Sequence, residues 1–149
     1  MDSFETVVVT TDFSETSRRA LPPALEIARR FGSRIALLHV VEDRLPPFVD
    51  EFTAYPVEEV LDSRVRRAEE ELERFARPYE GAGIEIDRVV LRGVPHVEIA
   101  GLAAARGAWL LAMATHGRGF ISHAIFGSTT ERVLRKAPCP VLTVRAPEP

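Results

Sequence analysis

The sequence predicts an α/β domain built on a five-stranded parallel, doubly wound sheet of the flavodoxin-like kind. Short β-branched runs alternate along the chain with stretches of helical periodicity, which is the pattern of βαβ units. Most of these runs are apolar nearly throughout, as in strands that are covered by helices on both faces. The length of 149 residues suits one domain, and no linker or internal repeat divides it. We therefore expect a single three-layer domain over residues 1–149, with 146–149 as a frayed tail.

Five apolar runs predict the strands. They cover residues 6–10, 35–41, 84–91, 109–113 and 141–144. In an open parallel sheet, ligands bind beyond the carboxyl ends of the strands, where the strand order reverses. The loops after the first and fourth strands, residues 11–14 and 114–128, are therefore the places where we expect a ligand.

Helical periodicity is clearest over residues 57–79, where apolar side chains recur every three or four positions and form one stripe. An earlier helix over residues 14–31 contains Pro22 and Pro23. These prolines remove backbone donors and clash with the preceding turn, so we expect a kink or a restart there. A last helix over residues 129–136 is expected to open with a capping box formed by Ser128 and Glu131.

Composition excludes several functional classes. The chain has 19 basic and 22 acidic residues, and this slightly acidic balance argues against general nucleic-acid binding. No run of about 18 apolar residues predicts a membrane span, and the N-terminus lacks the features of a secretory signal. The single cysteine, Cys139, lies between two prolines and is expected to be an inert packed thiol in a reducing compartment. Together these features predict a cytoplasmic protein. We expect no metal site made of protein ligands, because the four histidines lack partners at ligand spacing.

The strongest local motif is a glycine-rich segment, Gly117-Arg118-Gly119, that precedes Gly127-Ser128-Thr129 at the start of the last helix. A glycine before a helix N-terminus with free N–H groups is typical of an anion site. The chain contains no Asn, no Gln and one lysine, Lys136, at the far end of that helix. Phosphates would therefore be met by backbone N–H groups, hydroxyls and arginine.

Asp12, next to Thr11 where the first strand leads into the first helix, has two interpretations. Its carboxylate can cap the helix, with Glu15 completing a D-x-x-E box, or it can face a ligand at the switch point. Position alone favours neither.

The chain resembles the universal stress protein family nearly from end to end. The segments VVVTTDFSETSRRAL, LLHVV and GVPHVEI resemble its first strand and helix, second strand and third crossover. THGRGFISHAIFGSTTERVLRKAPCPVLTV resembles its closing third, which carries the nucleotide motif G-x2-G-x9-G-[ST]. Here the motif reads Ala114, Gly117, Gly127 and Ser128. The resemblance implies a fold of the adenine-nucleotide α-hydrolase-like group.

The resemblance also implies a site for ATP or AMP, with Mg²⁺ held mainly by the phosphates. Asp12 and the main chain of Val40 would meet the adenine, and residue 114 the ribose. Gly117, Gly127, Ser128 and Thr129 would hold the phosphates, and we add Thr11 and Arg118 by adjacency. Since no general base stands beside a positioned nucleophile, we expect a regulatory module with no catalytic residue.

Two departures from the family pattern stand out. Ala114 replaces the first glycine of the motif, and its methyl group could crowd a ribose or force a φ that alanine disfavours. Trp109 replaces an acidic residue at the start of a strand, where we expect a packing role. A member that binds no nucleotide and acts through its dimer surface therefore stays an alternative, as does a slow Mg²⁺-dependent ATPase.

Two further segments carry expectations. The long connection over residues 43–56 could close over a ligand with Phe48, Phe52 and Tyr55, or pack on its own domain or on a partner. The last strand, Val141–Val144, would expose an apolar edge in a monomer. The resemblance implies a homodimer in which two such edges meet across a two-fold axis.

Overall fold

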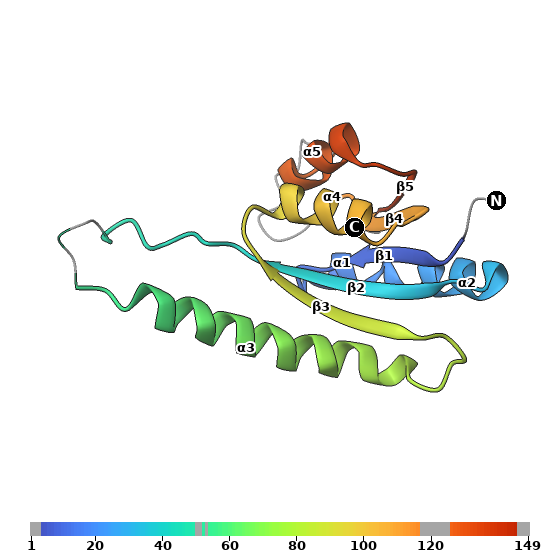
Figure 1. Ribbon diagram of the computed structural model, residues 1–149, viewed down its shortest axis with the longest axis horizontal. Coiled ribbons are helices and arrows are strands. Elements are labelled where there is room, and N and C mark those ends of the chain that lie inside the picture. The colour runs from blue at the N-terminus through green and yellow to red at the C-terminus, as the bar shows by residue number, and fades with distance from the viewer. Residues whose placement is uncertain (1–3, 50–51, 53, 117–125, 146–149) are drawn as a thin grey trace.

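The computed structural model describes residues 4–49, 52, 54–116 and 126–145 (Figure 1). Helices and strands alternate along the chain, with one break in the first helical stretch. The elements are β1 (Thr6–Thr10), α1 (Glu15–Arg18), α2 (Leu21–Phe31), β2 (Arg34–Val41), α3 (Val57–Ala76), the 3₁₀ turn η1 (Arg77–Tyr79), β3 (Ile86–Arg92), α4 (Pro95–Ala105), β4 (Leu110–Ala114), α5 (Ser128–Lys136) and β5 (Val141–Val144).

The five strands form one parallel sheet in the order β3-β2-β1-β4-β5. The fold class is therefore confirmed as a doubly wound α/β domain. Flavodoxin itself has the strand order 2-1-3-4-5. In the order found here β1 lies beside β4, so the strand order reverses between the two strands that the sequence analysis singled out.

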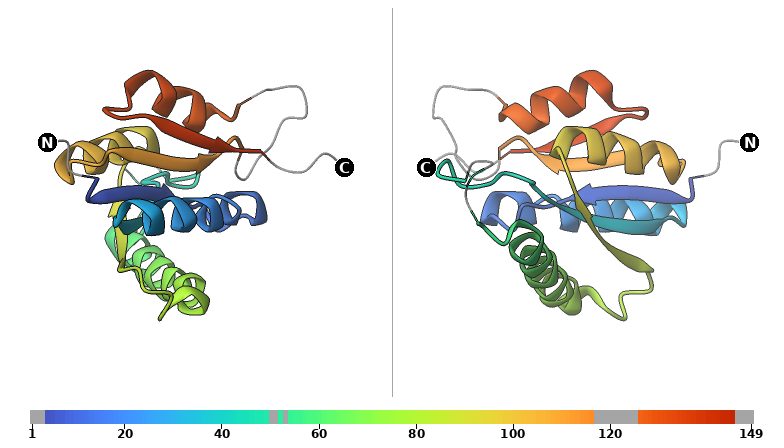
Figure 2. Two further views of the ribbon diagram at one scale, coloured as in Figure 1. Left: turned by 90° about the vertical axis from the view of Figure 1, so that its right-hand side faces the viewer. Right: turned by 60° about the vertical axis from the view of Figure 1, so that its left-hand side comes forward.

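Helices cover both faces of the sheet (Figure 2). Val7 and Val9 of β1 point into a core that α2 and α3 cover, whereas Val8 points into a core that α4 and α5 cover. All three valines are at most 1% exposed. Since successive side chains of a strand alternate between its faces, burial of both faces explains why β1 is apolar at three successive positions.

The predicted restart between residues 14 and 31 is confirmed. α1 ends at Arg18, and α2 begins at Leu21 with Pro22 and Pro23 in its first turn. A proline in that turn gives up an N–H that has no partner within the helix. The long predicted helix begins at Val57 as expected but ends as an α-helix at Ala76, after which residues 77–79 form a 3₁₀ turn that contains Pro78.

Other boundaries differ from the prediction by one or two residues. β3 begins at Ile86 rather than at residue 84, and β4 covers Leu110–Ala114 rather than 109–113. Trp109 lies just before β4, where its ring contacts Phe4 and Phe31 and its Nε1 donates to Ser33 Oγ at 3.0 Å. These contacts agree with the packing role expected of Trp109.

The predicted capping box at α5 is wrong. The N-cap is Gly127, with the extended φ and ψ of −67° and 161° that an N-cap needs, and Ser128 is already helical. Glu131 pairs instead with Arg135 at 2.8 Å, one helical turn further on.

The predicted tail, 146–149, lies outside the described residues. None of the helices that the structure describes is both long and apolar enough to cross a bilayer.

Candidate functional site

A cleft of about 840 Å³ opens at the carboxyl ends of β1, β2 and β4. This volume lies within the range of about 300–1,000 Å³ typical of small-molecule sites. The two loops expected to carry a ligand both border it. The predicted site residues that line it are Thr11, Asp12, Val40, Ala114, Gly127, Ser128 and Thr129. Gly117 and Arg118 lie outside the described residues.

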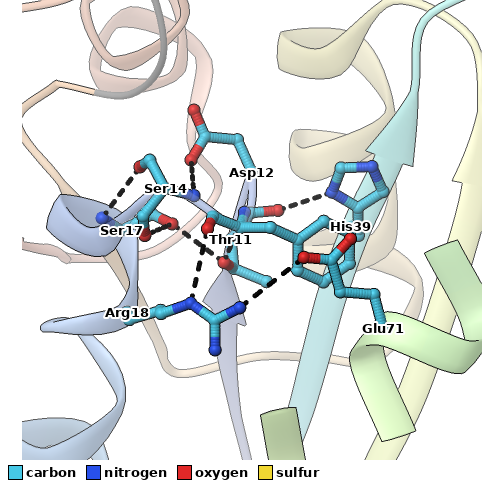
Figure 3. A network of polar contacts seen from close by, with 8 residues as sticks. Thr11, Asp12, Ser14, Ser17, Arg18, His39 and Glu71 are labelled. Atoms are coloured by element: carbon cyan, nitrogen blue, oxygen red, sulfur yellow. Dashed lines mark hydrogen bonds and ion pairs between the residues drawn. The ribbon is translucent and has the colours of Figure 1, made fainter. Parts of the chain in front are cut away.

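Asp12 does not cap the first helix. Its Oδ1 accepts a hydrogen bond from the backbone N–H of Ser14 at 2.9 Å, which closes a local turn. The cap is Ser14, whose Oγ accepts from the N–H of Ser17 at 3.1 Å (Figure 3). The capping interpretation of Asp12 and Glu15 is therefore wrong, and the half-buried Asp12 lines the cleft.

Side chains hold the turn that carries Asp12 from several directions (Figure 3). The Oγ1 of Thr11 accepts from the N–H of Phe13 at 3.0 Å and lies 2.9 Å from Ser17 Oγ. The Nδ1 of His39, on β2, donates to the carbonyl oxygen of Thr11 at 2.8 Å. Thr11 is 5% exposed, so its hydroxyl serves the turn itself.

Phe13 has a left-handed backbone, with a φ of 66°, and is the one such non-glycine residue in the described part of the chain. A phenylalanine in this region costs on the order of 1–3 kcal/mol, which the surrounding contacts must offset. Its ring stacks on the His39 imidazole with a centroid distance of 4.3 Å and an interplanar angle of 27°. Backbone strain thus lies one residue from the predicted ligand-facing carboxylate.

The opposite side of the cleft joins the end of β4 to the start of α5. Ala114 is extended and pairs with Val144 of β5, so the expectation that alanine would be forced into an unfavourable φ is wrong. Its carbonyl oxygen accepts from Thr130 Oγ1 at 3.0 Å. The N–H of Gly127 donates to the carbonyl oxygen of Thr115 at 2.7 Å. These two bonds fix the first turn of α5 against the end of the strand.

The N-terminus of α5 borders the cleft through Gly127, Ser128 and Thr129. No side chain in the described part of the structure caps this helix. Its first-turn N–H groups have no partner within the helix, and the helix dipole favours an anion there.

Sequence reasoning missed two arginines that line the cleft, Arg44 after β2 and Arg64 on α3. Arg64 Nη1 donates to the carbonyl oxygen of Arg44 at 2.9 Å, and Arg44 Nε lies 3.2 Å from Glu42 Oε2. The sequence did contain a pointer to Arg64. It lies three residues after Leu61 and four before Ala68, beside the apolar stripe of α3.

The aromatic residues of the 43–56 connection do not line the cleft. Phe48 and Phe52 are 67% and 89% exposed, and Phe48 contacts Tyr55 with a centroid distance of 5.9 Å. Figure 1 shows the chain after β2 leading away from the sheet before it returns into α3. The aromatic side chains of the connection therefore do not close over the cleft, whereas Arg44 at its start does line it.

Cys139 is half-buried and packs against the core under α4 and α5. Burial raises the pKa of its thiol, which agrees with the expected inert cysteine. Within the described residues, no group of three or more His, Cys, Asp or Glu side chains is arranged to hold a metal ion.

Comparison with known proteins agrees with this architecture along the whole chain. The family model described as universal stress protein family matches residues 3–145. The chain belongs to the universal stress protein family. A universal stress protein of Thermus aquaticus is 33% identical over 95% of this chain and 99% of its own length. One from Methanocaldococcus jannaschii is 31% identical over 97% of this chain and 84% of its own length.

Solved structures share the fold of this universal stress protein. A second protein from M. jannaschii is 28% identical, covers 99% of both chains and superposes with a TM-score of 0.81. A universal stress protein in complex with cAMP is 23% identical, with a TM-score of 0.67 over 96% of this chain and 98% of that one. The Archaeoglobus fulgidus protein in complex with dAMP is 21% identical, with a TM-score of 0.64 over 96% and 98%.

Proposed function

We propose that this universal stress protein binds an adenine nucleotide, ATP or AMP, in the cleft between β1 and β4 and acts as a regulatory module. The observation that carries the proposal is that residues expected to contact the adenine and residues expected to contact the phosphates line the same cleft. Asp12 and Val40 line it from the β1–β2 side, and Gly127, Ser128 and Thr129 line it from the start of α5.

The end of β2 suits an adenine edge. The carbonyl oxygen of Leu38 accepts from the N–H of Thr11 at 2.9 Å, which is the last backbone hydrogen bond that the described residues form between β2 and the β1 side. Backbone orientation in a strand repeats every two residues. The N–H and C=O of Val40 therefore point to the same side as those of Leu38, toward β1, but lie one step beyond the bond from Thr11. A donor and an acceptor side by side match the acceptor and N6 donor that adenine presents on one edge.

The start of α5 suits the phosphates. Its N–H groups and the hydroxyls of Ser128 and Thr129 are donors, and the helix dipole favours negative charge there. The chain has no side-chain amides, and Lys136 lies in the last turn of α5. Backbone and hydroxyl groups would therefore do most of the binding, with Arg118 as a further cation and Mg²⁺ carried by the phosphates.

Ala114 would meet the ribose. It is 6% exposed and its backbone is extended, so the methyl group is a local crowding of the cleft wall and not a distortion of the strand. The cleft keeps its volume of about 840 Å³ with this methyl in place. Proteins of the same fold have been solved with cAMP and with dAMP, which supports an adenine nucleotide as the ligand class.

Regulation would work by population shift. A nucleotide that contacts the β1–β2 side and α5 at once favours conformations in which the two sides are held together. A partner protein could then distinguish the loaded form from the empty one. This scheme needs no turnover.

We further propose a cytoplasmic homodimer that forms through β5. This strand pairs with β4 on one side and is the last in the sheet, and its four residues are half-buried. Pairing of two such edges across a two-fold axis would satisfy their backbone groups. Light scattering should give twice the chain mass, and Thr143→Pro should give the single mass because proline disrupts an edge ladder.

Titration calorimetry with ATP and Mg²⁺, and with AMP, tests the nucleotide proposal. We expect one site per chain, and we expect Asp12→Ala and Ser128→Ala each to weaken binding. No heat with millimolar nucleotide would refute the proposal. Phosphate release in the same samples tests the slow ATPase alternative, because hydrolysis at this site must fall in both variants.

A further inference from the structure

The turn that carries Asp12 has an anchor on α1, the side chain of Arg18. The Arg18 Nε donates to the carbonyl oxygen of Phe13 at 3.3 Å. This carbonyl belongs to the left-handed residue directly after Asp12. The contact therefore acts on the strained peptide unit that sets the direction of the aspartate.

Arg18 is itself held by α3. Its Nη2 lies 3.6 Å from Glu71 Oε1 (Figure 3). Its guanidinium carbon lies 4.7 Å from the centroid of the Phe75 ring. Glu71 and Phe75 are four residues apart, so they share one face of α3. α3 is separate in sequence from the β1–α1 turn, and Arg18 joins the two.

We propose that Arg18 is a positioning residue for Asp12, which holds the turn in its left-handed conformation by bridging the Phe13 carbonyl to Glu71 and Phe75 of α3. Its effect on ligand affinity rests on the proposed nucleotide site. Its effect on the turn does not depend on a ligand.

The chemistry of the guanidinium explains why arginine fits here. Its planar group presents several N–H donors in a fixed geometry, so one face can lie over Phe75 while separate nitrogens reach Phe13 and Glu71. A lysine ammonium is a single centre and cannot serve both oxygens from the same geometry. Arg18→Lys therefore keeps the charge beside Glu71 but removes the bridge.

The substitution Phe13→Gly provides the decisive comparison. Glycine adopts positive φ without the steric cost that phenylalanine bears, so a turn with glycine at this position needs no external clamp. If Arg18 offsets the strain at Phe13, Arg18→Lys must cost less when Phe13→Gly is already present. The lost ring of Phe13 is common to both arms of this double-mutant cycle and cancels.

The experiment compares the wild type with Arg18→Lys, Phe13→Gly, the double variant and Arg19→Lys. Arg19 is the exposed neighbour of Arg18 and serves as the matched control. Amide hydrogen exchange of Ser14, whose N–H is bonded to Asp12, reports the turn without ligand. Calorimetry with ATP and Mg²⁺ reports affinity.

We expect Arg18→Lys to speed exchange at Ser14 about tenfold and to weaken nucleotide binding about tenfold, while Arg19→Lys changes neither; a tenfold change corresponds to about 1.4 kcal/mol. In the Phe13→Gly background both effects should fall below about twofold. Equal effects in both backgrounds, or an Arg18→Lys variant that behaves like Arg19→Lys, would overturn the proposal. A wild type that binds no nucleotide refutes the proposed function, and the exchange data then still decide the role of Arg18.

Discussion

The hydroxyl of Thr130 donates to the carbonyl oxygen of Ala114 at 3.0 Å, across the junction between α5 and β4. Thr130 is 4% exposed and Ala114 is 6% exposed, so water does not compete for this bond. The bond joins the proposed phosphate-binding turn to the proposed ribose position. It therefore fixes the distance between the two parts of the site that a nucleotide would have to span.

Thr130→Val should lower both stability and nucleotide affinity. Valine has the shape of threonine but leaves the Ala114 carbonyl oxygen without its partner, which costs about 1–3 kcal/mol. Denaturant unfolding and calorimetry measure the two effects. Thr130→Ser keeps the hydroxyl and should retain most of the affinity, and a serine variant as weak as the valine one would show that the methyl group matters instead.

Gly127→Ser should separate stability from binding. Gly127 has the extended backbone of an N-cap, and a Cβ there would meet the Thr115 carbonyl oxygen at an ordinary 3.5 Å. Serine is the better cap, so unfolding stability should rise by a few tenths of a kcal/mol. The added side chain stands in the wall of the cleft, so nucleotide affinity should fall. Unchanged affinity would place the phosphates away from this turn.

Ala114→Gly should act in the reverse direction. Removing a buried methyl from the end of β4 and placing glycine in a strand should cost about 1–2 kcal/mol of stability. Nucleotide binding should tighten, because the methyl group no longer crowds the ribose. An affinity equal to that of the wild type would show that the alanine is no obstacle.

Cys139 should react slowly with iodoacetamide at pH 8. Burial raises the pKa of its thiol, so the folded protein holds less of the reactive thiolate than the unfolded chain does. We expect alkylation at least about tenfold faster in denaturant than in buffer. The raised pKa also makes folding stability depend on pH. Because the folded state binds the thiol proton more tightly than the unfolded state does, the contribution of Cys139 to stability is fully present below the ordinary thiol pKa and declines at more alkaline pH. Equal alkylation rates in denaturant and in buffer would refute the interpretation of Cys139 as a packed thiol.

Much of the fold could be predicted because burial on both faces leaves a plain mark in the sequence. β1 and β5 match their predicted bounds, since each is a short apolar run between polar residues. The break before Pro22 also followed from local chemistry. The errors of one or two residues in β3 and β4 arise where side chains outside the ladder, such as Trp109, are as apolar as those inside it.

The location of the cleft was predictable from the sequence, but the local geometry of the candidate site was less so. Ser128 and Asp12 both have cap-like spacing, yet the caps are Gly127 and Ser14, because a cap depends on where the backbone leaves the helix. The left-handed Phe13 could not be foreseen, since tertiary contacts and not its own preference hold it there. Arg44 lines the cleft because of the path that the chain takes after β2, which the sequence does not indicate.

The most direct test of the nucleotide site is a titration of ¹⁵N-labelled protein with ATP and Mg²⁺, followed by amide chemical shifts. A nucleotide that bridges the cleft must move the amides of Asp12 and Val40 together with those of Ser128 and Thr129, at one dissociation constant. Amides at the opposite end of the sheet, such as that of Arg34, should stay unchanged. Shifts confined to one side of the cleft, or none at millimolar nucleotide, would contradict the account.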